Sequence, residues 1–392
     1  MSTLKVDGIR SNSATSDAIT LASDGTCTAN ITNNLSNRNL IINGAMNVAQ
    51  RGTSSTTNGY GTVDRFRVAY GNTDEAPTQE QVDVASGTTP YTLGFRKAFK
   101  VTNGNQTSGA GASDNTYMLY TIEAQDVVCS GWNSLSSSSN ITLSFWVKSS
   151  VSQNFYGNLV SLDGTSQGYT YETGTLTANT WTKITKTIPG NSNIQIDNNN
   201  EGGLLLEFLI FRGTSQTGSV TLNQWRTYDS SVRNPDMTST WYTTNDATFE
   251  ITGVQLEVGS VATDFEHRSY AQELALCQRY LYVLVDQAGE STQRPVANLA
   301  GYTNSYLYGD IDLPVDMRTP PTIVSASGTN YFLLYGGGGT TGVYAPQVYS
   351  ARQSTSVCEL QVIGAATNIV AGAPYFMRTN NASAYVHFWA EL

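Results

Sequence analysis

The chain changes its hydrophobic period within residues 249–284, and this change constrains the fold more than any other feature of the sequence. In the first half apolar and polar residues alternate, and Gly253 lies where a β-bulge would restore the phase. The alternation predicts a half-buried strand. A helix is predicted from Ser269, because Ser269 and Gln272 form a capping box and Glu273 places an acid in the first turn.

The predicted helix extends from Ser269 to Leu284 and carries two apolar rows, so it must be covered on two sides. The first row contains Tyr270, Leu274, Cys277 and Leu281, and the second contains Leu276, Tyr280 and Val283. Flanking domains of one chain could cover both rows, or three chains could cover them around a common axis. The residues alone leave both arrangements open.

The composition indicates a β-rich protein with an extracellular type of surface. Only 13% of the 392 residues are charged, while neutral polar residues, Gly and Tyr are plentiful. A chain of this length is expected to form two or three domains. The 21 basic and 31 acidic residues give a net charge of −10, which argues against a nucleic-acid-binding protein.

Neither export, metal binding nor catalysis is indicated by a motif. The amino terminus shows no signal-peptide pattern, and no long apolar span predicts membrane insertion. The two histidines, His267 and His387, belong to no catalytic or metal-binding motif. We expect no cofactor, no metal and no enzymatic activity. The cysteines are expected to be reduced core residues, and they are Cys27, Cys129, Cys277 and Cys358.

The first 38 residues contain apolar clusters that are each too short to form a monomeric core. They are interpreted as an attachment or shaft segment of intertwined chains, with a disordered tail as the alternative. Residues 39–266 read as short strands separated by Gly, Asn and Ser turns, which predicts a β-sandwich or jelly roll. The predicted strands lie within residues 62–70, 94–102, 117–124, 141–150, 180–188, 204–211 and 249–258.

Trp146 is a candidate glycan-binding residue in the predicted strand at residues 141–150. Leu143, Phe145 and Val147 alternate toward the expected core, so Trp146 points to the opposite face. An outward indole on a sheet can stack against a sugar ring. The alternative is that a loop or a neighbouring subunit covers the indole.

Residues 286–392 return to strands rich in Tyr and Gly, and this segment is predicted to form a β-rich tip. Four tyrosines flank or follow the glycine run at residues 336–339 and are candidates for receptor or glycan binding. They are Tyr331, Tyr335, Tyr344 and Tyr349. Alternatively, these rings pack inside the tip.

Several strings resemble parts of bacteriophage tail-fibre and receptor-binding proteins, especially those of marine and cyanobacterial phages. The string GVQLEVGSVATDFEHRSYAQELALCQRY resembles their helical junction, and DIDLPVDMRTPPTIV and AYVHFWAEL resemble elements of their tips. The strings TLSFWVKSS, WTKITKTIP and TFEITGVQLEVG are similar to strands of jelly-roll carbohydrate-binding modules, and NLIINGAMN is similar to their opening strand.

The resemblance implies a mainly β, homotrimeric, non-enzymatic virion fibre that adheres to the host cell surface. It divides the chain into an attachment or shaft segment (1–38), a jelly-roll sandwich (39–266), a helical trimer junction (267–285) and a β tip (286–392). The implied partners are a virion adaptor, tail or other structural protein at the amino terminus and a host glycan or protein. Synthesis in the host cytoplasm and release by lysis are implied as well.

Other functions remain open at this stage. The sequence departs from longer podovirus-type fibres, which have a substantial amino-terminal virion-binding domain, so decoration of the capsid or another part of the virion is an alternative. A glycan-degrading tail spike or a free carbohydrate-binding module is a second alternative. Hydrolysis would need a pair of carboxylates assembled in space, which the sequence alone does not reveal.

Overall fold

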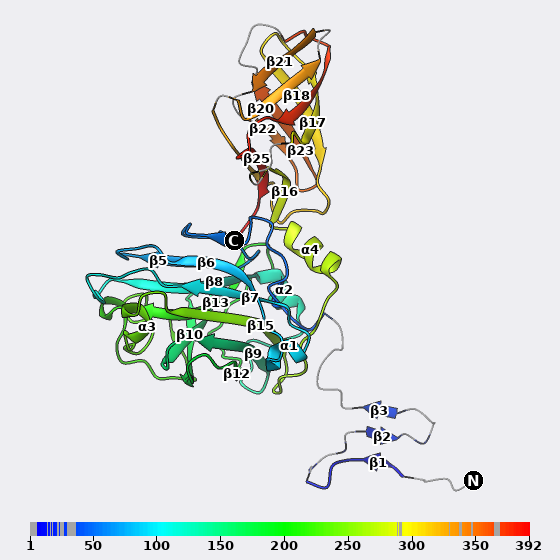
Figure 1. Cartoon of the computed structure of the whole chain (residues 1–392). Coiled ribbons are helices and arrows are strands. Elements are labelled where there is room, and N and C mark those ends of the chain that lie inside the picture. Colours follow the sequence, from blue (N-terminus) through cyan, green and yellow to red (C-terminus); the bar gives the residue numbers. More distant parts are fainter. Residues whose placement is uncertain are drawn as a thin grey trace.

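A computed structural model describes residues 6–13, 15, 17, 19–21, 23, 27–29, 37–287, 289, 292–328, 330–336, 339–345, 348–363 and 369–392. The protein is mainly β (Figure 1), and its helices are short. Besides the junction helix, they are α1 (Thr89–Thr92), α2 (Ala124–Cys129), the 3₁₀ turn Thr214–Gln216 and α3 (Thr240–Thr243).

Two six-stranded antiparallel sheets form the sandwich that the sequence predicted. One sheet contains, in spatial order, β14 (Trp225–Thr227), β11 (Gln167–Thr175), β10 (Asn154–Ser161), β13 (Gly202–Arg212), β8 (Asn115–Glu123) and β5 (Arg67–Gly71). The other contains β12 (Thr182–Pro189), β9 (Asn140–Ser149), β15 (Thr248–Val258), β7 (Lys97–Thr102), β6 (Thr78–Asp83) and β4 (Ser54–Ser55). Their facing side chains form one large apolar core.

The predicted strands of the sandwich are confirmed as β5, β7, β8, β9, β12, β13 and β15. The apolar strand β13 lies inside its sheet between β10 and β8 and is buried along most of its length, as a strand covered on both faces requires. Leu143, Phe145 and Val147 of β9 all point into the core. The prediction missed β10 and β11, because Asn, Gly and Tyr interrupt their apolar alternation.

The bulge predicted at Gly253 is present in β15, where the register with β9 shifts between Thr252 and Gln255. Gly253 has a φ of 63°, and a Cβ at this position would lie 2.6 Å from the Phe95 ring, so only glycine fits without strain. The string NLIINGAMN is buried but is not a strand, which corrects the expectation from its resemblance. Its backbone turns sharply, with a φ of 60° at Asn43.

The junction helix is shorter than predicted. Helix α4 spans Tyr270–Gln278 and begins with the predicted capping box of Ser269 and Gln272. The chain then enters strand β16 (Leu281–Asp286), so a helix up to residue 285 was wrong. The run YLYVLVD is rich in aromatic and β-branched residues, and pairing with the carboxy-terminal strand favours the extended form. Leu281 is therefore a strand residue.

The carboxy-terminal unit consists of two antiparallel sheets packed around a second core. The smaller sheet has the order β16, β25 (Tyr385–Trp389) and β19 (Thr322–Ser325). The larger sheet has the order β21 (Gly339–Ala345), β20 (Phe332–Gly336), β24 (Pro374–Thr379), β17 (Pro295–Gly301), β18 (Tyr306–Asp312), β23 (Val357–Ile363) and β22 (Val348–Gln353). We call this unit, from β16 onward, the tip.

Near the amino terminus, a small antiparallel sheet contains β1 (Gly8–Ile9), β2 (Ile19–Leu21) and β3 (Cys27–Ala29). Ile9, from the first predicted apolar cluster (Leu4, Val6 and Ile9), lies on β1 and is 52% exposed, and the second cluster, Ile19 and Leu21, lies on β2. Leu4, which belongs to the same predicted cluster as Ile9, and Ile31, the third predicted cluster, lie outside the described residues.

A buried ionic cluster joins the tip to the sandwich. Glu391, which follows β25, accepts hydrogen bonds from Arg65 at 2.5 Å and from Arg51 at 3.1 Å. Arg51 also lies 3.8 Å from Asp64, and all four side chains are at most 7% exposed. The Arg65 guanidinium lies 3.4 Å from the centre of the Tyr280 ring. The tip is therefore oriented by charges held out of solvent.

Replacement of Glu391 by Gln is expected to destabilise the protein by about 3 kcal/mol, because two buried guanidinium groups lose their counter-charge. Thermal and denaturant unfolding measure this loss. Glu201→Gln is the matched control, since Glu201 pairs with Arg318 at 3.6 Å but its side chain is 66% exposed. Equal unfolding midpoints for the two variants would contradict the role of the cluster.

Asp64 makes the stability of this cluster depend on pH. Burial raises the pKa of Asp64 to about 6, so the folded chain retains a proton there that the unfolded chain releases near pH 4. Stability contributed by this group is expected to fall as pH rises from about 4 to about 6. Asp64→Asn should remove that slope in unfolding measurements across this range. Asp83→Asn, at an acid whose side chain is 82% exposed, should leave the slope unchanged.

Candidate functional site

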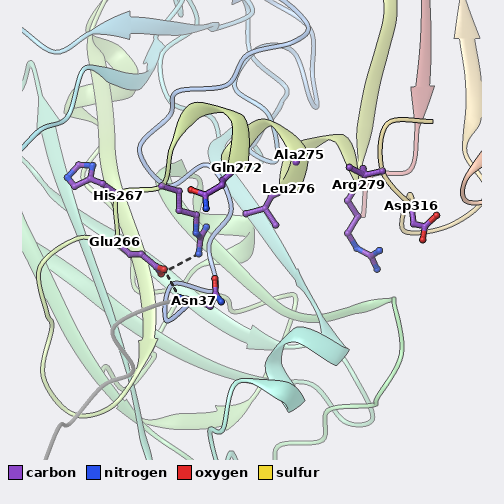
Figure 2. A pocket seen from close by; sticks show the side chains of 10 residues that line it. Asn37, Glu266, His267, Gln272, Ala275, Leu276, Arg279 and Asp316 are labelled. Atoms are coloured by element: carbon purple, nitrogen blue, oxygen red, sulfur yellow. Dashed lines mark hydrogen bonds and ion pairs between the residues drawn. The ribbon is translucent and has the colours of Figure 1, made fainter. Parts of the chain in front are cut away.

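A hollow of about 640 Å³ lies between α4 and the segment that enters the sandwich. Figure 2 shows Glu266 directed toward Asn37, beside the helix residues Gln272 and Leu276. Glu266 accepts hydrogen bonds from the backbone N–H groups of Asn37, at 2.6 Å, and Asn39, at 2.8 Å. Arg268 donates to the Asn39 carbonyl at 2.6 Å. Glu266 and Arg268 thus hold the backbone of residues 37–39, where the chain enters the sandwich. We therefore assign the hollow a structural role.

Helix α4 presents one face to the core and the other to solvent. Glu273 and Cys277 are buried, and Leu274 packs partly against the sandwich core. Tyr270 is 60% exposed and Leu276 is 36% exposed. The first predicted apolar row of the helix therefore does not form one face. Cys277 and part of Leu274 face the core, Tyr270 faces solvent, and Leu281 lies on strand β16.

Trp146 lines a small cleft on the outer face of β9. The cleft has a volume of about 230 Å³, and Lys183, Gly253 and Phe265 also line it. Trp146 is half-buried and packs beside a small apolar cluster that contains Phe95. Pockets that enclose drug-sized ligands measure about 300–1,000 Å³, so this cleft can accept only part of a larger ligand.

Three aromatic rings form the wall of the Trp146 cleft. The rings of Phe95 and Phe265 meet edge to face at 4.9 Å, and His267 lies 5.1 Å from Phe95 and 4.9 Å from Phe265. The segment after β15, which includes Phe265, folds back over this face of the sheet. A covering loop was the alternative to an open sugar platform, and the structure places one beside Trp146.

The four candidate tyrosines of the tip occupy different environments. Tyr331 is half-buried and packs against the tip core. The Tyr335 hydroxyl donates to Gln293 at 3.2 Å, and the Arg378 guanidinium lies 5.4 Å from its ring centre. Tyr344 lies on strand β21 and Tyr349 on β22. The middle of the predicted glycine loop, residues 337–338, lies outside the described residues.

The sequence did not single out the most exposed aromatic residues of the described tip. Tyr302 is 71% exposed, Phe376 is 58% exposed and Tyr306 is 39% exposed. Tyr302 and Tyr306 flank the hairpin between β17 and β18. The sequence could have predicted this exposure, because two tyrosines flank the turn sequence Thr-Asn-Ser. Aromatic rings at the end of a hairpin cannot all reach a core.

Neither a metal centre nor a membrane span is found in the part of the chain that the structure describes. No group of three or more His, Cys, Asp or Glu side chains there is suited to hold a metal ion. No helix in the described ranges is long and apolar enough to cross a bilayer. Cys277 and Cys358 are buried free thiols, whereas Cys129 is exposed, so the expectation that all cysteines are core residues was wrong.

Comparisons with known proteins give only distant similarities. No protein-family model and no curated protein matches the chain. The structure is similar to the enzymatically active domain of tailspike protein 4 from bacteriophage CBA120, with 12% identity, a TM-score of 0.30, and coverage of 56% of this chain and 21% of that chain.

Carbohydrate-binding domains give similar values. The amino-terminal cellulose-binding domain of β-1,4-glucanase C from Cellulomonas fimi shows 10% identity and a TM-score of 0.26, over 55% of this chain and 99% of that chain. The tandem CBM22 domain of Xyn10C from Paenibacillus barcinonensis shows 10% identity and a TM-score of 0.25, over 83% of this chain and 91% of that chain. At such TM-scores the similarities carry no functional argument.

Replacement of Trp146 by Ala tests whether its cleft holds a sugar. If a sugar ring stacks on the indole, the affinity for a soluble neutral oligosaccharide that the wild type binds is expected to fall about tenfold, measured by calorimetric titration. Leu135→Ala is the control, because Leu135 is 57% exposed and does not line the cleft. Equal affinities of both variants would assign Trp146 to packing alone.

Proposed function

We propose that this chain is a non-enzymatic virion protein of the phage tail-fibre type, which attaches the particle to the host cell surface. The protein is made in the host cytoplasm and acts outside the cell after lysis. Its amino-terminal segment docks on a virion adaptor, tail or other structural protein, and its tip contacts the host. The observation that carries this proposal is the group of exposed aromatic side chains on the tip, Tyr302, Tyr306 and Phe376.

The arrangement of the chain supports this assignment of the two ends. The sheet of β1–β3 and the tip lie on opposite sides of the sandwich in Figure 1. A fibre needs its contact surface at the end away from the particle. Exposed tyrosine rings suit such a surface, because they supply large contact areas at a low cost in conformational entropy.

The acidic residues support binding rather than hydrolysis as the proposed activity. Glycoside hydrolases of the common type place two carboxylates on either side of the scissile bond. Among its described lining residues, the Trp146 cleft has one carboxylate, Asp264. Glu359 is likewise the one carboxylate among the described residues that line the cleft on the tip sheet. The hollow beside α4 has two, Glu266 and Asp316, but Glu266 is already bound by the backbone N–H groups of Asn37 and Asn39. We therefore propose recognition without cleavage.

The solvent face of α4 supports a homotrimer as the assembled form. Tyr270 and Leu276 expose apolar surface there, next to the segment that enters the sandwich. Burial of these side chains against neighbouring chains would remove that surface from water. A trimer would also combine three weak receptor contacts on one fibre and raise the overall strength of attachment.

Two measurements on the purified protein test this function. Light scattering is expected to give three times the chain mass of 42.3 kDa. A fluorescently labelled sample is expected to be retained on bacteria that the corresponding phage infects and not on resistant mutants, with no soluble oligosaccharide released. A monodisperse monomer would remove the fibre assignment. Equal retention on both cell types would remove receptor binding, and released oligosaccharide would reveal an enzyme.

A further inference from the structure

The outer face of the seven-stranded tip sheet contains a cleft of about 590 Å³, within the size range of small-molecule sites, about 300–1,000 Å³. It combines aromatic, charged and amide side chains from neighbouring strands and from the hairpin after β17. The lining residues are Ala300, Gly301, Tyr302, Tyr308, Arg352, Glu359 and Gln361. None of the sequence motifs pointed to this cleft.

An exposed ring forms one side of the cleft and is held in place. Tyr302 is 71% exposed, and its ring meets that of Tyr308 edge to face, at 5.5 Å and 88°. The Tyr302 N–H donates to the Tyr306 carbonyl at 2.8 Å, and Thr303 Oγ1 accepts from the Tyr306 N–H at 3.1 Å. The hairpin therefore presents a flat apolar surface without the entropic cost of ordering a free loop.

Polar groups with free hydrogen-bonding capacity face this ring. Gln361 donates to the Tyr308 hydroxyl at 2.6 Å, which leaves its carbonyl oxygen available. Arg352 and Glu359 are paired in the register of β22 and β23. In the described part of the chain neither side chain makes a hydrogen bond or an ion pair, and Glu359 is half-buried. Their donors and acceptors are available to a ligand.

The backbones are closely packed at Gly301, which lines the cleft, and at Gly309 on the neighbouring strand β18. A Cβ on Gly301 would lie 2.3 Å from the Val370 carbonyl oxygen, and one on Gly309 would lie 2.3 Å from that of Asn298. Gly301 also accepts a hydrogen bond from the Gly372 N–H at 2.7 Å. The side chains thus project from a fixed surface, as a preorganised site requires.

We propose that this cleft binds a neutral sugar unit of a surface glycan, with the Tyr302 ring stacked on the apolar face of the sugar. Arg352, Glu359 and Gln361 bind its hydroxyl groups, which act as both donors and acceptors. The opposite charges of Arg352 and Glu359 balance, so the lining favours a neutral sugar over a sulfated or carboxylated one. This inference rests on the proposed adhesive function and identifies the ligand class of the tip.

The test uses full-length protein and surface polysaccharide extracted from bacteria that retain the wild type. Mild acid releases short oligosaccharides, so that multivalent binding does not hide the loss of one contact. Calorimetric titration is expected to show binding by the wild type. Tyr302→Ala and Arg352→Ala are each expected to weaken it at least tenfold. Raising the salt concentration tenfold should change the affinity less than twofold, because the ligand is neutral.

The control is Val357→Ala, which shortens an exposed apolar side chain of the same sheet, on β23, that does not line the cleft. Its affinity should remain within twofold of the wild type, and circular dichroism should show equal folding of all variants. Unchanged binding by Tyr302→Ala, or binding of none of the extracted oligosaccharides by the wild type while the cells still retain it, overturns the cleft assignment and leaves adhesion intact. Absence of retention on any cell overturns the proposed function itself.

Discussion

The position of the tip depends on the buried ionic cluster around Glu391. The two guanidinium groups of Arg51 and Arg65 and the carboxylate of Asp64 lie on the sandwich, whereas Glu391 comes from the end of the tip. Desolvation of such groups offsets much of their attraction, so the cluster specifies a geometry more than it adds stability. Glu391, the shared partner of both guanidinium groups, reaches them only when both units are folded and docked. Tyr280, just before β16, and Glu391, just after β25, both contact Arg65 of the sandwich. Both ends of the tip are therefore fixed to the sandwich.

Much of the fold was predictable because it depends on local patterns. The core-facing apolar rows of β9 and β15, the apolar strand β13 and the bulge at Gly253 are properties of short segments, and each was confirmed. The prediction that β15 is half-buried was wrong, because its polar residues are buried as well. The capping box at Ser269 is equally local. These features were readable because strand faces, bulges and helix caps depend on the nearest residues in sequence.

The end of the helix and the positions of the aromatic residues depended on distant parts of the chain. Apolar residues between 279 and 286 fit a helix period, but β25 supplies hydrogen bonds to an extended segment, and Leu281 pairs with Trp389. The Trp146 face was read correctly as the non-core side of β9, yet its covering segment comes from after β15. Tyr302, after β17, and Arg352, on β22, line one cleft because β17, β18, β23 and β22 are neighbours in that order in the sheet. No local sequence pattern reveals this order.

The two aromatic clefts differ in the kind of ligand that they can admit. The Trp146 cleft is narrowed by Phe265 and His267 and has a volume of about 230 Å³, so a ligand must fit between fixed rings. The tip cleft is larger, at about 590 Å³, and Tyr302 stands open to solvent. A glycan chain attached to a cell cannot thread into a closed pocket, but it can lie across an open cleft on a sheet. For contact with a surface polymer, the open geometry and the fixed hairpin of the tip are the more suitable combination.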